Sequence, residues 1–122
     1  MAVAKFDPDG GPINVEVSCV PNRNGSYTIK LWEANSNQVV KKYPGNFLNT
    51  ADDRYELDPP NSRHDGRLLE GMVVVAIPPG VGPSQVSMVV SQGGNVLATD
   101  AGSVPPGSPG QLVDFFIDLE SK

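Results

Sequence analysis

The polar side chains that could do chemistry gather around the only histidine of the chain, His64. Asp65 follows His64 directly, and Asp58 precedes it in the same polar stretch. An imidazole titrates near neutral pH and can act as a general base, whereas carboxylate oxygens are the ligands that calcium prefers. One alternative is therefore a hydrolytic or calcium-binding site built from loops. Beside His64, its candidate residues are Asp52, Asp53, Asp58 and Asp65.

No nucleophile that could act with His64 occurs in a recognised catalytic sequence motif. A catalytic serine on a sharp strand-to-helix turn has the spacing Gly-x-Ser-x-Gly, and Gly107-Ser108-Pro109-Gly110 departs from it. The simpler interpretation places His64 in a solvated polar loop. We therefore expect a protein that is not an enzyme.

The glycines after the most apolar run imitate a nucleotide-binding loop without its essential parts. Gly80-Val81-Gly82 would need a following helix N-terminus and a third glycine to hold phosphates. Gln occupies position 85, and prolines interrupt the segment at 78, 79 and 83. Cys19 is the only cysteine, so a disulfide within the chain and a cysteine-rich zinc site are excluded. We expect no cofactor.

Aromatic residues supply the candidate binding site. If the alternate residues of 27–31 are buried, Trp32 faces outward beside Lys30, and Tyr43 lies on the next predicted strand. Exposed aromatic rings can stack on a sugar or anchor a protein partner. The predicted binding residues are therefore Trp32, Tyr43 and Lys30. The alternative is that both faces of this strand are covered and that Trp32 belongs to the core.

The elements that must position these residues are strands, because apolar and polar residues alternate with a period of two. Ile13–Val20 and Gln111–Glu120 show the alternation most clearly. The chain has 13 glycines and 12 prolines, which lie mostly between such runs and suit turns. We predict one all-β domain over residues 1–122, an antiparallel β-sandwich of about eight strands, with a small β-barrel as the alternative. The predicted strands are Ile13–Val20, Ser26–Glu33, Val39–Tyr43, Arg54–Leu57, Leu68–Ile77, Val86–Ser91, Asn95–Thr99 and Gln111–Glu120.

Further expectations concern how these strands connect. The first three are predicted to form a meander, and residues 1–11 a flexible or irregular arm. A short helical turn capped by Asn49 or Thr50 is predicted before Arg54. Gln92-Gly93-Gly94 predicts a tight hairpin.

One predicted strand is more apolar than is usual for an antiparallel strand that exposes one face to water. Residues 72–77 are apolar at every position, so this strand should be covered on both faces or meet a partner. Gly71 inside this strand predicts a bulge or a close approach of the backbone. The segments 78–83 and 101–110 are predicted to be irregular loops rich in proline and glycine.

Charge and composition exclude further classes of protein. The formal net charge of the 122 residues is −5, and the only adjacent basic pair is Lys41-Lys42, so nucleic acid is not an expected ligand. No apolar stretch is long enough to span a bilayer, so no membrane contact is expected. The first residues are no hydrophobic signal segment, and the chain as written is predicted to be cytoplasmic.

These observations favour a non-catalytic protein-binding or assembly module, whose partner is another protein or a copy of itself. The over-apolar strand and the proline-rich loops support it, because proline lowers the entropy cost of holding a bound loop shape. A carbohydrate-binding module is the alternative, with Asn35, Asn37 and Asn46 adding hydrogen bonds to the aromatic pair. The loop site around His64 is the second alternative.

Overall fold

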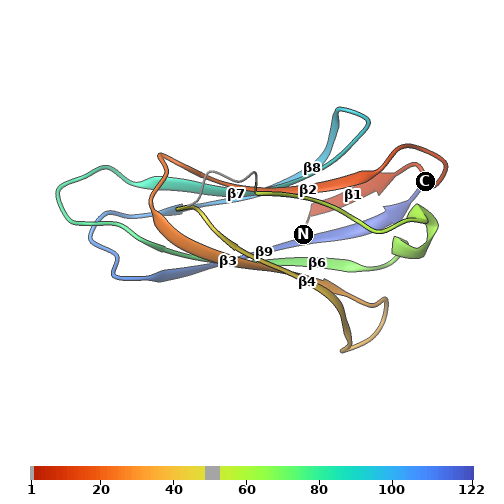
Figure 1. The fold of residues 1–122 in the computed structure, drawn as a ribbon, viewed down its shortest axis with the longest axis horizontal. Coiled ribbons are helices and arrows are strands. Elements are labelled where there is room, and N and C mark those ends of the chain that lie inside the picture. The colour runs from red at the N-terminus through yellow and green to blue at the C-terminus, as the bar shows by residue number, and fades with distance from the viewer. Residues whose placement is uncertain (1, 49–52) are drawn as a thin grey trace.

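The chain forms two stacked β-sheets in a computed structural model that describes residues 2–48 and 53–122 (Figure 1). The first sheet has the strand order β1-β9-β6-β3-β4, and the second has the order β5-β2-β7-β8. Neighbouring strands are antiparallel except β1 and β9, which are parallel. The strands are β1 (Ala2–Phe6), β2 (Ile13–Val20), β3 (Asn24–Trp32), β4 (Val39–Asn46), β5 (Arg54–Glu56), β6 (Leu68–Ala76), β7 (Ser84–Gln92), β8 (Asn95–Val104) and β9 (Gln111–Ser121).

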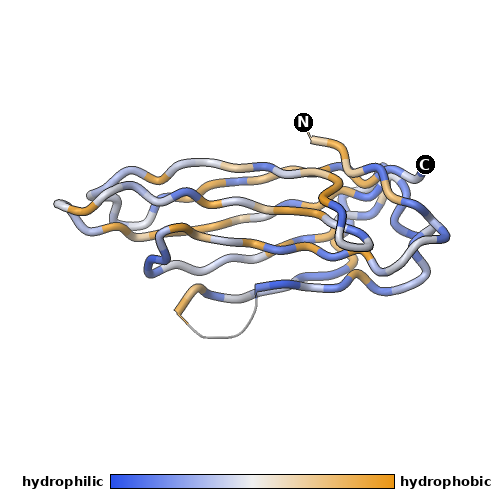
Figure 2. The backbone as a smooth tube through the Cα atoms, turned by 90° about the horizontal axis from the view of Figure 1, so that it is seen from above, coloured by the Kyte–Doolittle hydropathy of each residue, from blue (hydrophilic) through white to orange (hydrophobic). Residues whose placement is uncertain are grey.

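The predicted all-β sandwich is confirmed, and the two separate sheets exclude the alternative of a closed barrel. Apolar and polar residues follow one another along the strands (Figure 2), and burial follows the same rhythm. In β2, for example, Ile13, Val15 and Val17 are buried, whereas Glu16 and Val20 are exposed. Each strand thus points one row of side chains into the layer between the two sheets. The apolar surface of these side chains is removed from water there, which stabilises the fold.

The predicted meander of the first three strands is wrong. Only β3 and β4 pair with each other, while β2 lies in the opposite sheet against β7 and β5. The chain crosses between the sheets at residues 21–23. Crossing places the buried face of β2 against the buried face of β3, which buries both rows at once. A turn signal at Asn22–Gly25 cannot distinguish this crossing from a hairpin, since both need the same local residues.

The expected irregular arm at residues 1–11 is wrong over its first part. Ala2–Phe6 forms β1 at the edge of the first sheet, parallel to the last strand. Ala4 and Phe6 are fully buried. A parallel neighbour more than 100 positions away in the sequence leaves no local signal, and five residues are too few to show a clear alternation.

The apolar strand at residues 68–76 lies in the middle of the first sheet, between β3 and β9. Val73 and Val75 are buried on its inner face, whereas Val74 on the outer face is 40% exposed. Within the described chain, therefore, only one face of this strand is fully covered. The register of β6 with β3 and β9 continues through Gly71, so the predicted bulge is absent there. Its nearest neighbours are side chains and not the predicted backbone, since a Cβ at Gly71 would lie 2.9 Å from the sulfur of Met88.

The connections agree with the sequence in part. β7 and β8 form the predicted hairpin, and Gly93 and Gly94 both have positive φ at its turn. The loop expected at 101–110 is shorter, because β8 continues to Val104. The predicted helical turn near Asn49 lies outside the described residues. No helix among the described residues is long and apolar enough to cross a membrane.

Candidate functional site

His64 is a buried structural residue, which overturns its predicted place in a solvated loop. It ends a short 3₁₀ helix, Asn61–His64, and only 2% of its surface is exposed. Its Nδ1 lies 3.2 Å from the Nη1 of Arg67, and its Nε2 lies 2.7 Å from the carbonyl oxygen of Asp58. Arginine can only donate, so Nδ1 accepts and Nε2 donates its proton to Asp58.

Both ring nitrogens of His64 are engaged inside the fold. Burial lowers the pKa of the imidazole below its ordinary value, and the nearby guanidinium of Arg67 acts in the same direction. Arg67 is itself held by two hydrogen bonds to the carboxylate of Glu33, at 2.9 and 3.1 Å. The group Glu33–Arg67–His64–Asp58 therefore braces the end of β3 and the start of β6 against the 3₁₀ helix.

The candidate metal ligands are not brought together. Asp53 accepts a hydrogen bond from the hydroxyl of Tyr27, Asp58 pairs with Lys41 at 3.2 Å, and Asp65 accepts a hydrogen bond from the backbone of Ser121. Among the residues that the structure describes, no group of three potential metal ligands converges. Asp52 lies outside the described residues. The described candidates for a hydrolytic or calcium-binding site are therefore not gathered in one place.

The predicted aromatic pair lies on opposite faces of the first sheet. Tyr43 is opposite Ile29 in the β3–β4 register, points into the core and is 8% exposed. Trp32 is partly buried on the outer face, where its Nε1 donates to Glu70 at 3.1 Å. The ammonium group of Lys30 lies 5.9 Å from the centre of the Trp32 ring. The prediction that Tyr43 belongs to an exposed binding surface is wrong. The β3–β4 pairing shifts register between Leu31 and Trp32, whose partners are Lys41 and Val39. A shift by one residue turns the side chains that follow to the opposite face of the sheet.

Trp32 instead borders a groove on the outer face of the first sheet. The groove has a volume of about 520 Å³ and runs from the β3–β4 loop to β9. Its lining combines two aromatic rings with carboxylates and amides, namely Trp32, Phe116, Glu70, Asp118, Asn35 and Asn37. Hydrogen-bonding side chains and partly exposed rings thus lie together, although Tyr43 is not among them.

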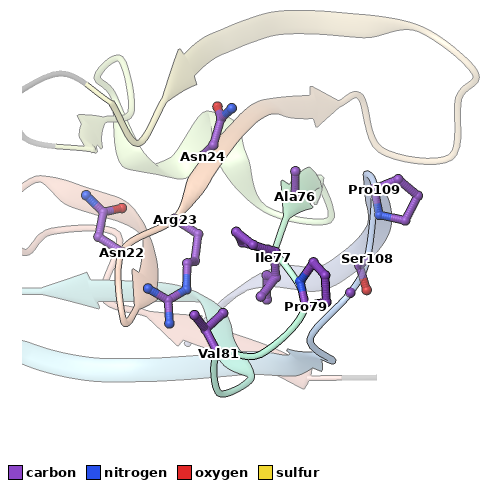
Figure 3. A pocket seen from close by; sticks show the side chains of 11 residues that line it. Asn22, Arg23, Asn24, Ala76, Ile77, Pro79, Val81, Ser108 and Pro109 are labelled. Carbon is purple, nitrogen blue, oxygen red and sulfur yellow. The ribbon is translucent and has the colours of Figure 1, made fainter.

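A larger groove lies at one end of the sandwich, where three connections meet (Figure 3). These are the β2–β3 connection, the β6–β7 connection and the β8–β9 connection. The groove has a volume of about 610 Å³. Its walls are mainly apolar. Its lining includes Arg23, Ile77, Pro79, Val81, Ser108 and Pro109.

Backbone and side-chain hydrogen bonds hold these three connections against one another. The amide of Ile77 donates to the carbonyl of Ser108 at 2.9 Å, and the Ser108 hydroxyl donates to Pro105 at 2.7 Å. The hydroxyl of Ser84 donates to the carbonyl of Pro21 at 2.8 Å. With proline restricting φ along the same loops, the groove has a fixed shape before anything binds.

Arg23 is the only ionisable residue among the described residues that line this groove. Its guanidinium points toward Val81, beneath the apolar walls (Figure 3). The Nε atom is buried and finds no hydrogen-bond acceptor within the described chain. A buried N–H without an acceptor carries an energetic cost, whereas Arg23 as a whole is only partly buried, so a ligand in the groove would meet the exposed part of this side chain.

Sequence reasoning missed this groove because its parts lie far apart in the chain. The prolines of 78–83 and 101–110 did mark rigid loops of the kind that bind. Nothing in the sequence indicated that Arg23 would lie between them, since the β2–β3 connection appeared to be a hairpin turn. Comparison of the chain with protein-family models, with curated proteins and with solved structures finds no match.

Proposed function

We propose that the protein is a non-catalytic binding module that holds a segment of a protein partner in the groove around Arg23. The observation that supports it best is Arg23, partly exposed and the only ionisable residue among the described residues that line a mainly apolar, proline-containing groove. A cation without an ion-pair partner among the described residues, in a mainly apolar site, matches a ligand that carries both a carboxylate and an apolar group.

The groove has the properties that peptide recognition needs. Its apolar walls gain free energy by covering a hydrophobic side chain, at about 25 cal/mol per Å² of area removed from water. The guanidinium forms directional, charge-assisted hydrogen bonds to a carboxylate. The proline-rich loops are already ordered, so little conformational entropy is lost on binding. We therefore expect a segment in which an acidic residue is next to an apolar one.

Selection from a random peptide library displayed on phage tests this proposal. The selected peptides should carry an acidic residue beside an apolar one. Their affinity should fall at least about tenfold for Arg23→Ala and for Val81→Asp, which places a negative charge beside the guanidinium. The matched control is Val96→Asp, the same change at an exposed position of β8 outside the groove lining, which should leave binding unchanged. Failure to select any peptide, or equal binding to every variant, would contradict the proposal.

A carbohydrate-binding function is the second candidate, and the outer-face groove of Trp32 and Phe116 supports it. Aromatic rings next to carboxylate and amide groups suit a sugar, which has apolar C–H faces and many hydroxyls. A glycan array should then show binding that Trp32→Ala abolishes. Tyr43→Phe should leave that binding unchanged, because the Tyr43 ring lies inside the core. An array without any bound glycan would remove this candidate.

A further inference from the structure

We infer that the segment which fills the Arg23 groove is the acidic opposite end of a second copy of this chain. The inference rests on the proposed function and names the partner of the same groove. It places the two ends of one molecule in the roles of receptor and ligand. Copies would then associate head to tail.

The two ends of the sandwich differ sharply in charge. The β1–β2 loop and the segment 57–66 lie at the end opposite the Arg23 groove, beside the C-terminus (Figure 1). These two segments carry Asp7, Asp9, Asp58 and Asp65 against one basic residue, Arg63. At the Arg23 end, the three described connections 21–23, 77–83 and 105–110 contain no acidic residue. The net charge of −5 is thus distributed unevenly along the long axis.

The acidic end also has a groove of its own, with a volume of about 330 Å³. Its lining is again rich in proline, with Pro8, Pro12, Pro59 and Pro60. Its ionisable residues among those described are Asp9 and Glu56. The two grooved ends therefore present similar rigid, proline-lined surfaces with opposite charge.

The carboxylates of this second groove are free to meet a cation. Asp9 and Glu56 are exposed, and neither side chain has an ion-pair or hydrogen-bond partner among the described residues. Asp58 and Asp65, by contrast, are engaged by Lys41 and by the backbone of Ser121. Asp9 and Glu56 are accordingly the groups that we pair with Arg23 of another copy.

Charge also determines the symmetry of the association. A twofold dimer joined end to end would bring two Arg23 ends or two acidic ends together, and like charges would repel. Head-to-tail contact joins unlike ends and leaves one free groove at each end of the pair. Such a heterologous contact continues into an open chain of copies unless the rotation closes a ring.

Reversal of charge at each end, followed by mixing, tests the inference. Sedimentation equilibrium of the wild-type protein should show an average mass that rises with concentration up to about 1 mM, and less so at high salt. Arg23→Glu alone and the double variant Asp9→Arg/Glu56→Arg should each weaken association at least about tenfold. An equimolar mixture of the two should restore it, because each variant now complements the other.

The controls separate association from folding and from net charge. Lys42→Glu makes the same charge change as Arg23→Glu at an exposed position of β4 and should associate like the wild type. Thermal unfolding followed by circular dichroism checks that each variant is folded. If Arg23→Glu does not fold, the double variant at exposed positions still has to weaken association.

Two results would overturn the inference. One is a wild-type protein that stays strictly monomeric at about 1 mM, and the other is association that neither charge reversal affects. Peptides that bind the Arg23 groove of a monomeric protein would reject the second copy as partner and leave the proposed function standing. The loss of both peptide binding and association would reject both.

Discussion

At the scale of single residues, burial determines what each polar group does. His64 and Arg67 lie in a stretch that reads as a polar loop, yet both are buried and hydrogen-bonded to each other. Tyr27 is a second example, since its hydroxyl bonds Asp53 and Tyr55 inside the sandwich. Burial, and next the bond to Asp53, raise the pKa of Tyr27 well above its ordinary range. These groups stabilise the fold through satisfied hydrogen bonds.

The Glu33–Arg67 pair predicts a loss of stability in acid. The hydrogen bond from Arg67 lowers the pKa of Glu33 from 4.5 to about 2. A lowered pKa in the folded state means that stabilisation is complete above pH 4.5 and is lost as the pH falls toward 2. Urea unfolding of Glu33→Gln between these pH values should show a weaker pH dependence than the wild type. Glu16→Gln, at an exposed position, should keep the wild-type dependence; equal slopes for all three proteins would contradict the assignment.

Gly45 predicts a steric effect beside the Tyr27 hydroxyl. It lies opposite Tyr27 in the β3–β4 register, and a Cβ at this position would overlap the Tyr27 hydroxyl and the Tyr55 hydroxyl. Because Tyr27 is buried and held by its hydrogen bonds, Gly45→Ala should destabilise the protein by about 1–3 kcal/mol. Gly11→Ala is the control, since a Cβ there meets no atom within 4 Å. Chemical denaturation measures both, and a neutral Gly45→Ala would show that Tyr27 moves aside.

At the scale of elements, the two edges of the first sheet are built differently. β4 ends the sheet with exposed lysines, which discourage pairing with another chain. β1 ends it with a parallel strand whose inner residues, Ala4 and Phe6, complete the core beneath β9. This short strand is therefore a part of the fold rather than an appendage.

Removal of the buried ring of β1 tests its importance. Phe6 is fully buried, so Phe6→Ala should lower the free energy of unfolding by about 3–5 kcal/mol through lost burial and a new cavity. Lys5→Ala, the exposed neighbour on the same strand, should change it by less than about 0.5 kcal/mol. Similar small effects for the two variants in thermal or urea unfolding would show that residues 2–6 contribute little to the stability of the fold, as expected of a flexible arm.

At the scale of the whole molecule, both sheets share one layer of buried side chains. Buried residues of every strand but β5 belong to one apolar cluster, which includes Ile29 and Leu69 of the first sheet and Val15 and Met88 of the second. Neither sheet can keep its inner face out of water without the other. The long axis of the sandwich then separates the apolar Arg23 end from the acidic end.

A shared core predicts that the chain unfolds as one cooperative unit, with a free energy of unfolding of about 5–15 kcal/mol. Trp32 fluorescence reports on the first sheet, and far-ultraviolet circular dichroism reports on both. The two signals should change together along a urea titration. Separate transitions would mean that one sheet persists without the other and would contradict the predicted single domain.

The sequence by itself determined the fold class and most strand positions. The alternation in Ile13–Val20 placed β2 at its observed limits, and Gly93-Gly94 placed the hairpin between β7 and β8. This information is local, because a strand's two faces and a turn's positive φ depend on neighbours within a few residues.

Only the tertiary structure decided which strands pair, which faces are covered and where the grooves lie. Strand β1 needed β9 as its neighbour, Arg67 beside His64 needed Glu33, and the Arg23 groove needed three distant connections. Contacts between residues far apart in the chain leave no periodic signal. The candidate site was for that reason absent from the sequence prediction, whereas the layers that support it were present.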